Sequence, residues 1–449
     1  MQLLGIPDNI EKPIIKANGV SIASVMVDQA VGEIATCSFQ VPPEFSGAFS
    51  SYGEIVTVTV ASKSASGIVF KGKLLGRGFS DMTGNINCRV DLAHDVASKL
   101  DSSSTLFPGN MPGSAFDNEA YIKPSRKQCT AGQQGGSTMV GLKLTSNFVQ
   151  DVKTTMLEYI NSAASKTGSN MIRPIEVGDA IYAIQRMLPL AGQIADPDSA
   201  ENGITENLNA ILKSSSTSST FWNTLSQFFG GLDLVMVCKT NGELLVIPNY
   251  SGVKADGKNK IPKEWVIQFD QSSKYERTPK KVVVLVSDIP PKPLSGLKNQ
   301  DIYCGEHELE NAPASASGQF CAEAPPFLRS MTMFQNIGKH KQMMDKYAKL
   351  IATRETAKFM TCNVTCPLIL DVFPGVPVSF EHLSSIKTFS GGSVPGFNKK
   401  FDGYVWKISH EISTSGFPKT RFSMTSVTDG AFEKVGSHPF WTGATMPTW

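Results

Sequence analysis

Alternation of apolar and polar residues dominates the first part of the chain and predicts β-strands there. In the stretch IVTVTV at 55–60 every second residue is valine, so one face of the strand is uniformly apolar. Similar runs, separated by Gly, Ser and Pro, make five predicted strands: 20–28, 34–42, 54–61, 67–75 and 85–93. Five short strands at this spacing favour a small barrel or a sandwich.

The middle of the chain has a mixed pattern. Residues 104–145 are rich in Gly, Pro and Ser and show no periodicity, which predicts a long inserted loop. Apolar residues then recur at helical spacing in three segments: 147–164, 178–189 and 221–229. Two strand-like runs in 232–248 flank Asn241-Gly242, which predicts a hairpin closed by a type I′ turn.

The last third returns to strands. We expect them in EWVIQFD, in KKVVVLVS, and in four later segments: 360–366, 376–380, 402–412 and 419–427. Residues 289–327 form a second predicted insertion, and a glycine-rich loop interrupts the strands at 390–400. The run KHKQMMDKYAKLIATRETAKF at 339–359 has an apolar stripe at helical spacing and predicts an amphipathic helix.

Three short phrases recur in the same order in the two β regions. CSFQVP, YGEIVTV and FKGKLLG in the first region correspond to CNVTCP, FPGVPVSF and FDGYVWK in the last third. Any one match alone is compatible with chance, but three in one order favour an internal duplication. The glycines at 53, 72, 375 and 403 would form tight turns or bulges where a strand bends. The sequence therefore predicts two similar small β-barrels.

Length and composition limit the kind of protein. A chain of 449 residues suggests two to four domains, and a net charge of +2 gives no strong attraction to nucleic acid. No apolar stretch approaches the ~18 residues that a membrane-spanning helix needs, and the N-terminus lacks the pattern of a signal peptide. The 8 cysteines are too sparse for a disulfide scaffold.

Candidate chemical groups are few. We expect His410 to be a packed, hydrogen-bonded core residue on one strand face with Tyr404, Trp406, Ile408 and Ile412, while Ser409 points to the opposite face and cannot pair with it. Cys304, His307 and Cys321 are the nearest approach to a metal site, but zinc prefers four ligands. A 304–321 disulfide is a second option, and free thiols are the default. The sequence predicts no cofactor, no metal and no catalytic residue.

The chain resembles the hub proteins of long-tailed bacteriophage tails, the baseplate or tail-tip hub family also called late-control-D-like. The resemblance lies in FPGVPVSF, in FDGYVWKISHEISTSGFPKTRFSMT, and in the mid-chain FFGGLDLVMVCKTNGELLVIP. It implies a homotrimer whose barrels form a pseudohexameric ring, continuing the tail tube or a distal tail protein. A spike, fibre or other baseplate protein would lie on the distal side, with the tape-measure protein and later DNA in the lumen. Since no spike module follows residue 449, we expect any spike to be a separate chain.

We therefore expect a β-dominated α+β fold with two similar small β-barrels, a mixed helical and hairpin middle region and long loop insertions. The expected domains are 1–105, 106–262 and 263–449. Predicted subunit or tube interface residues are Phe70, Gly72, Leu74, Phe401, Gly403, Tyr404 and Val405, and a docking arm is predicted at Phe440, Trp441 and Trp449.

The expected role is structural and non-enzymatic, in the virion tail, after synthesis in the host cytoplasm and without a membrane anchor. The alternatives are a tail-associated cell-wall hydrolase or a host-binding tail protein. The hydrolase is disfavoured because residues 106–262 contain no histidine and no recognisable carboxylate motif. A secretion-system spike protein is disfavoured by the missing spike module.

Overall fold

The computed structural model describes the two β regions and several elements between them. The described residues are 12–51, 53–62, 65–79, 86–91, 122–123, 142–144, 175–176, 222, 226, 230, 233–242, 244–253, 255, 257–273, 279–285, 304–309, 318–324, 337–357, 360–384, 397–428 and 449. The helices predicted at 147–164 and 178–189 lie outside these residues. Within 221–229, Trp222 and Ser226 are helical.

The first β unit follows the predicted strands closely. It consists of β1 (Ile14–Ala17), β2 (Val20–Ser21), β3 (Ser24–Ala30), β4 (Thr36–Val41), the 3-10 helix η1 (Pro43–Phe49), β5 (Ile55–Ala61), β6 (Ser66–Phe79) and β7 (Ile86–Asp91). Neighbouring strands follow the order β3-β4-β7-β6-β5-β1-β2. In β5 the three valines are buried and Ile55 is exposed, as the alternation predicts.

The second β unit is built from the last third of the chain. It consists of β13 (Lys260–Ile261), the 3-10 helix η2 (Lys263–Trp265), β14 (Gln268–Ser273), β18 (Met360–Pro367), β19 (Pro377–Ser384), β20 (Phe397–Ser413) and β21 (Lys419–Thr428). Its order is β14-β18-β21-β20, with β19 pairing both β20 and β13. Its core clusters around Val364, Phe373, Phe380 and Phe422.

The two units have the same strand order. The path β3-β4-β7-β6-β5-β1 of the first corresponds to β14-β18-β21-β20-β19-β13 of the second. The repeated phrases fall on matching strands: β4 with β18, β5 with β19, and β6 with β20. One difference is that β1 pairs antiparallel with β5 whereas β13 pairs parallel with β19. The duplication read from the sequence is present in the fold.

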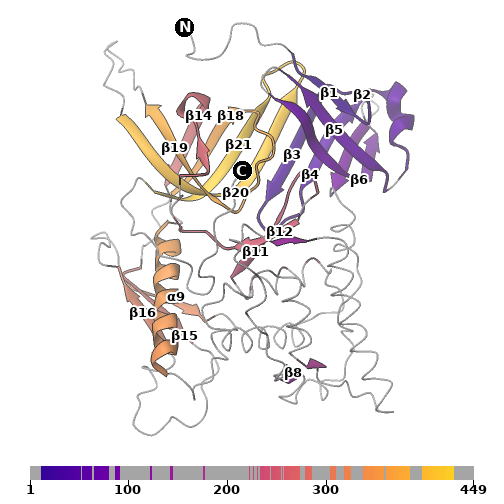
Figure 1. Cartoon of the computed structure of the whole chain (residues 1–449). Coiled ribbons are helices and arrows are strands. Elements are labelled where there is room, and N and C mark those ends of the chain that lie inside the picture. Colours follow the sequence, from indigo (N-terminus) through magenta and orange to yellow (C-terminus); the bar gives the residue numbers. More distant parts are fainter. Residues whose placement is uncertain are drawn as a thin grey trace, which may run out of the picture.

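A shared strand joins the units into one sheet. The first part of β20, Phe397 to Tyr404, pairs with β19, and its second part, Lys407 to Ser413, pairs with β3. The result is a 13-stranded sheet that runs through both units, which lie side by side in Figure 1. The predicted β-dominated α+β class is confirmed. The described pairings do not close either unit into a barrel, so closure remains a prediction.

The remaining elements lie beneath the sheet in Figure 1. Strands β11 (Leu234–Cys238) and β12 (Leu244–Pro248) form the predicted hairpin, with β9 (Leu142–Leu144) along β12. The predicted type I′ turn is wrong. Leu244 faces Cys238 across a five-residue loop, in which Gly242 has a positive φ of 92° and Asn241 does not. A longer loop needs only one residue in the left-handed region. A two-residue parallel pair joins β8 (Ile122–Lys123) to β10 (Ile175–Glu176).

A helix-and-sheet module is inserted between β14 and β18. The predicted amphipathic helix is confirmed as α9 (Ile337–Ala357). It packs on a three-stranded sheet of β15 (Lys281–Leu285), β16 (Cys304–Glu308) and β17 (Gln319–Glu323). The prediction of a loop insertion at 289–327 is wrong in part, because these residues contain β16 and β17. The strands CGEHE and QFCAE are short and polar, and each takes its backbone partner from the apolar β15.

Candidate functional site

The junction between the two units, where β20 meets β3, is the candidate functional site. Lys407 lies opposite Ala30 and Ser413 opposite Ser24. The ladder is bounded by hydrogen bonds from Val31 N to Trp406 O at 3.0 Å and from Thr414 N to Ala23 O at 2.9 Å. Hydrogen-bonded and non-hydrogen-bonded pairs alternate in an antiparallel ladder. The pair at positions 409 and 28 is therefore a non-hydrogen-bonded one, with its side chains close together.

Polar side chains tie the junction on one face. Ser409 Oγ donates to Asp28 Oδ1 at 2.5 Å, and Lys407 Nζ lies 3.0 Å from the same oxygen. The Lys407 and Asp28 side chains are 34% and 28% exposed. An ion pair this exposed adds little stability, but it favours one register because slippage would separate all three groups.

The opposite face of the junction holds the buried His410. Its Nδ1 lies 2.9 Å from Thr420 Oγ1, and its Nε2 lies 3.4 Å from Gln29 Nε2. Gln29 Nε2 also donates to Val372 O at 3.3 Å. Burial lowers the pKa of His410 to about 4. His410 is thus the packed core residue expected from the sequence, and Ser409, bonded to Asp28 on the other face, cannot form a nucleophile–base pair with it.

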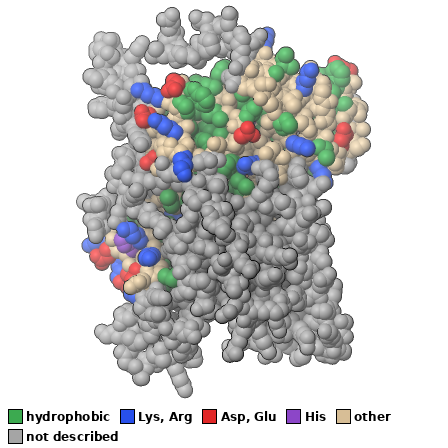
Figure 2. All heavy atoms as spheres, in the orientation of Figure 1, with side chains coloured by type: hydrophobic (Ala, Val, Ile, Leu, Met, Phe, Trp, Pro, Cys, Tyr) green, Lys and Arg blue, Asp and Glu red, His purple; other side chains and the backbone are tan. Residues whose placement is uncertain are grey.

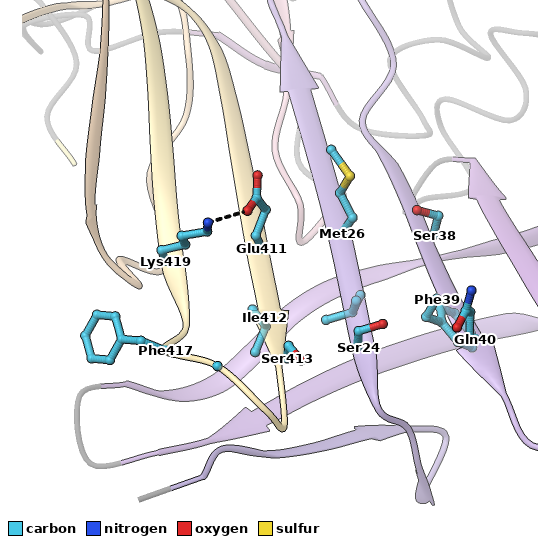
Figure 3. Close-up of a pocket in the computed structure, with 12 residues that line it drawn as sticks. Ser24, Met26, Ser38, Phe39, Gln40, Glu411, Ile412, Ser413, Phe417 and Lys419 are labelled. Carbon is cyan, nitrogen blue, oxygen red and sulfur yellow. Dashed lines mark ion pairs between the residues drawn. The ribbon is translucent and has the colours of Figure 1, made fainter. Parts of the chain in front are cut away.

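An open pocket of about 460 Å³ spans the junction. Its walls come from β3, β4, β20 and the loop into β21, as Figure 3 shows. Glu411 and Lys419 form an ion pair of 2.8 Å at its rim. The other lining groups are mainly hydroxyls, amides and apolar side chains, such as Ser24, Gln40 and Met26.

A turn next to the junction is duplicated at the level of single hydrogen bonds. Gly53 N donates to Leu74 O at 2.8 Å, and Gly375 N donates to Val405 O at 2.7 Å. Leu74 N and Val405 N in turn donate to the backbone carbonyl of the residue that follows each glycine, at 2.9 and 3.0 Å. The two glycines have φ of 81° and 92°, a region that favours glycine.

A β-bulge is also duplicated. The register of β6 on β7 shifts between Leu74 and Gly76, and that of β20 on β21 shifts between Val405 and Lys407. The residue inside each shift is a large exposed apolar one, Leu75 at 43% and Trp406 at 41%. The expectation that Trp406 shares the face of His410 is wrong, because the bulge interrupts the alternation. Hydrophobic side chains gather over the two units among charges of both signs (Figure 2).

The predicted interface residues are all buried within the chain. They are Phe70, Gly72, Leu74, Phe401, Gly403, Tyr404 and Val405. Of their two strands, β20 forms the junction with β3, and β6 lies within the first unit. The assignment of these residues to an assembly interface remains a prediction. In the predicted docking arm, Phe440 and Trp441 lie outside the described residues. Trp449 packs on its own chain: its Nε1 donates to Phe373 O at 3.1 Å, and its ring stacks on Phe422 at 5.3 Å.

The candidate metal and disulfide residues are kept apart by the fold. Cys304 lies in β16 and Cys321 in β17, on opposite sides of β15. Two strand spacings alone would separate them by roughly 9–10 Å, and they also lie opposite different residues of β15, Leu285 and Val283. Bridged cysteines have Cα atoms about 4.4–6.8 Å apart. Both are free thiols. The part of the chain that the structure describes holds no group of three metal-binding side chains, and none of its helices has the length and apolar character to cross a bilayer.

A buried ion pair fastens α9 to the hairpin. Arg354 Nη1 and Nη2 donate to the two carboxylate oxygens of Asp233 at 3.0 and 2.9 Å, and Nη2 also donates to Asn249 O at 2.6 Å. The two side chains are 7% and 9% exposed. The sequence pattern gives no sign of Asp233, and it places Arg354 only within the predicted amphipathic helix. The positive φ of Asp233, 55°, is a backbone feature that the sequence does not indicate.

Comparisons with known proteins find structural matches only. No family model and no curated protein matches the chain. A tail protein from Neisseria meningitidis MC58 matches 97% of this chain and 99% of its own, with 10% identity and a TM-score of 0.44. The 43 kDa tail protein of prophage MuSo2 from Shewanella oneidensis matches 92% and 96%, with 10% identity and a TM-score of 0.40. Prophage tail protein gp18 from Listeria monocytogenes EGD-e matches 89% and 88%, with 9% identity and a TM-score of 0.38. The similarity to these three proteins is one of structure, at sequence identities of 9–10%.

Proposed function

We propose that this chain is a structural hub of a phage tail tip or baseplate, and that three copies form a ring of six similar β units. The observation that carries the proposal is the duplication. Two units with one strand order lie edge to edge in a single sheet, joined by β20 and β3. Repetition of such an edge-to-edge contact generates a ring when the rotation closes.

Three chains then present two symmetries at once. Six β units with matching topology provide six equivalent contacts for a sixfold tail tube or distal tail protein. The module of α9 and β15–β17 lies between β14 and β18 of the second unit, whereas residues 31–35 alone join the equivalent strands β3 and β4 of the first. It therefore appears three times in the ring and marks a threefold side, where a spike, fibre or other baseplate protein would bind. This is the work of a symmetry adaptor.

The ring would line the channel of the virion tail. The tape-measure protein would occupy the channel first and DNA would pass through it later. The role is non-enzymatic, which agrees with the geometry at the most suggestive residues. Ser409 and His410 point to opposite faces of β20, where each has a different structural partner.

The test is the solution mass of the purified chain combined with top-view particle averages. We expect a mass of three times 48.5 kDa and a ring with a central channel and six peripheral lobes. A trimer with three dissimilar lobes would keep the oligomer and remove the pseudohexamer. A particle of two or four chains would contradict the proposed hub.

A further inference from the structure

We propose that neighbouring copies join through one defined strand pair, in which the second part of β6 of one copy pairs antiparallel with β14 of the next. The proposal rests on the ring described above and specifies its contact between chains. The second copy of this chain is the partner because the chain already contains the same contact once, between its own β20 and β3.

The two strands are the topological equivalents of the pair that forms the internal junction. Strand β6 holds the place in the first unit that β20 holds in the second, and β14 holds the place of β3. The second part of β20 pairs with β3, so the equivalent contact of the first unit is the second part of β6 with a β14. Within one chain these two strands stand near opposite ends of the sheet order. The β14 that pairs with β6 at this place would therefore belong to another copy.

Among the residues that the structure describes, neither edge has a partner strand at this place. Strand β14 ends the sheet order, and among the described residues only β18 pairs with it. The described ladder between β6 and β5 ends at Lys73. The next residue, Leu74, makes its backbone hydrogen bonds with the turn at Gly53. A Cβ added at Gly76 would have nothing within 4 Å. The equivalent position in β20, Lys407, is where pairing with β3 begins.

The register on β6 follows from matched glycines. Gly72 and Gly403 lie opposite equivalent valines of β5 and β19. The bulge that follows each glycine occurs at the same place in both strands. Counting along both strands from these glycines therefore makes Gly78 the equivalent of Ser409.

The register on β14 follows from matched cysteines. The matching phrases CSFQVP and CNVTCP begin with Cys37 and Cys362. Val27 of β3 lies opposite Cys37, and Gln271 of β14 lies opposite Cys362. The next residues, Asp28 and Ser272, are therefore equivalent. Since Asp28 faces Ser409 at the internal junction, Ser272 of one copy would lie opposite Gly78 of its neighbour in a non-hydrogen-bonded pair.

The two junctions differ in side chains in a way that keeps them distinct. The internal junction has Lys407, Ser409 and Asp28, bonded to one another. The equivalent positions between chains are Gly76, Gly78 and Ser272, which are small and uncharged. Backbone hydrogen bonds would therefore dominate the contact between chains. A copy that offered β14 to β20 would leave Lys407 and Ser409 without Asp28, so the charged set favours the internal pairing.

The experiment is a disulfide trap with Gly78→Cys and Ser272→Cys in the same full-length chain. Non-hydrogen-bonded antiparallel partners have Cα atoms about 4.5 Å apart, within the ~4.4–6.8 Å that a disulfide spans. Mild oxidation should give a covalent ladder that ends at three chains on a non-reducing gel and collapses with reductant. The matched control pairs Gly78→Cys with Asp270→Cys, a diagonal neighbour roughly 7–8 Å away, and should give no ladder. Each single variant controls for the native cysteines.

A second variant tests the same edge without a cross-link. Thr361 Oγ1 donates to Ser272 O, so that carbonyl faces β18, and the backbone N–H of Gln271 must face the open edge. Proline is tolerated on an edge strand where its N–H would face outward. Gln271→Pro should keep the fold by circular dichroism but give a mass of one chain.

The mass of the same samples separates the two proposals. A trimer without a disulfide between positions 78 and 272, or a Gln271→Pro trimer, would overturn the strand pair and leave the hub. A ladder that continues beyond three chains, or a chain that remains monomeric at every concentration, would overturn the closed ring and the pairing with it.

Discussion

The duplicated turn gives a prediction in which one chain provides both the test and its control. Gly53 and Gly375 occupy equivalent positions, with φ of 81° and 92°. Gly53 donates its N–H to Leu74 O of β6, and Gly375 donates its N–H to Val405 O of β20. Replacement by alanine leaves these bonds possible and adds one methyl group in the left-handed region, which costs roughly 1–2 kcal/mol at either position.

The surroundings of the added methyl group differ between the two turns. At Gly53 a Cβ would have nothing within 4 Å. At Gly375 it would lie 3.0 Å from both Ile247 Cδ1 and Val237 Cγ2, side chains of the buried hairpin. Overpacking of a filled core adds about 1–3 kcal/mol. We therefore expect a loss of about 1–2 kcal/mol for Gly53→Ala and about 2–5 kcal/mol for Gly375→Ala.

Native-state hydrogen exchange read by mass spectrometry is the suitable assay, because it assigns the loss of protection to a segment. Gly53→Ala should weaken protection in β5 and β6, and Gly375→Ala should weaken it more strongly in β19, β20 and the hairpin. Equal losses in the two variants, or a larger loss for Gly53→Ala, would refute the packing argument. Alanine variants as stable as the parent chain would refute the backbone argument as well.

Three further predictions concern other residues. Arg354→Met should lower the free energy of unfolding by about 3–5 kcal/mol because Asp233 stays buried without its partner, and adding Asp233→Leu should restore part of the loss in urea denaturation. The free energy of unfolding should fall by up to about 3 kcal/mol as the pH drops from 6.5 towards 4. The reason is that His410, with its lowered pKa, stays neutral in the folded chain while the same residue takes up a proton in the unfolded chain. His410→Gln should lack this pH dependence, and an unchanged pH dependence in that variant would contradict the buried, neutral state of His410. Trp406→Ser and Leu75→Ser should each lower the free energy of unfolding by about 1–2 kcal/mol, because more than half of each side chain is covered. Both variants should still fold but bind tail-tube rings more weakly in co-sedimentation, and full retention of binding would exclude the bulges as tube contacts.

The parts of the fold set by local pattern could be predicted. The valines of β5 and the apolar stripe of α9 are periodic within one element. The repeated phrases could be found because a turn that requires Gly53 or Gly375 fixes that residue type in sequence. The strands of the second unit could also be predicted from local pattern, and their observed ends differ from the predicted ones by a few residues.

The parts that depend on distant partners could not be predicted. The strands CGEHE and QFCAE carry no apolar alternation, and they form because β15 supplies backbone partners on both edges. The bulge at Trp406 depends on the register of β21, which no window of sequence contains. The bond from Ser409 to Asp28 joins residues 381 positions apart. The buried charges of Asp233 and Arg354 are likewise partners only in three dimensions.

The pairing of β3 with β20 also fixes the order in which the sheet can form during synthesis. Strand β3 leaves the ribosome early, while the stretch of β20 that pairs with it follows 381 positions later, roughly 20–75 s at ~5–20 residues per second. During that time the edge of β3 has no partner from its own chain, and an open edge is a template for pairing with other chains. Release of the completed C-terminal region is therefore the step that protects the N-terminal unit, so a nascent chain truncated before β20 would carry an aggregation-prone edge.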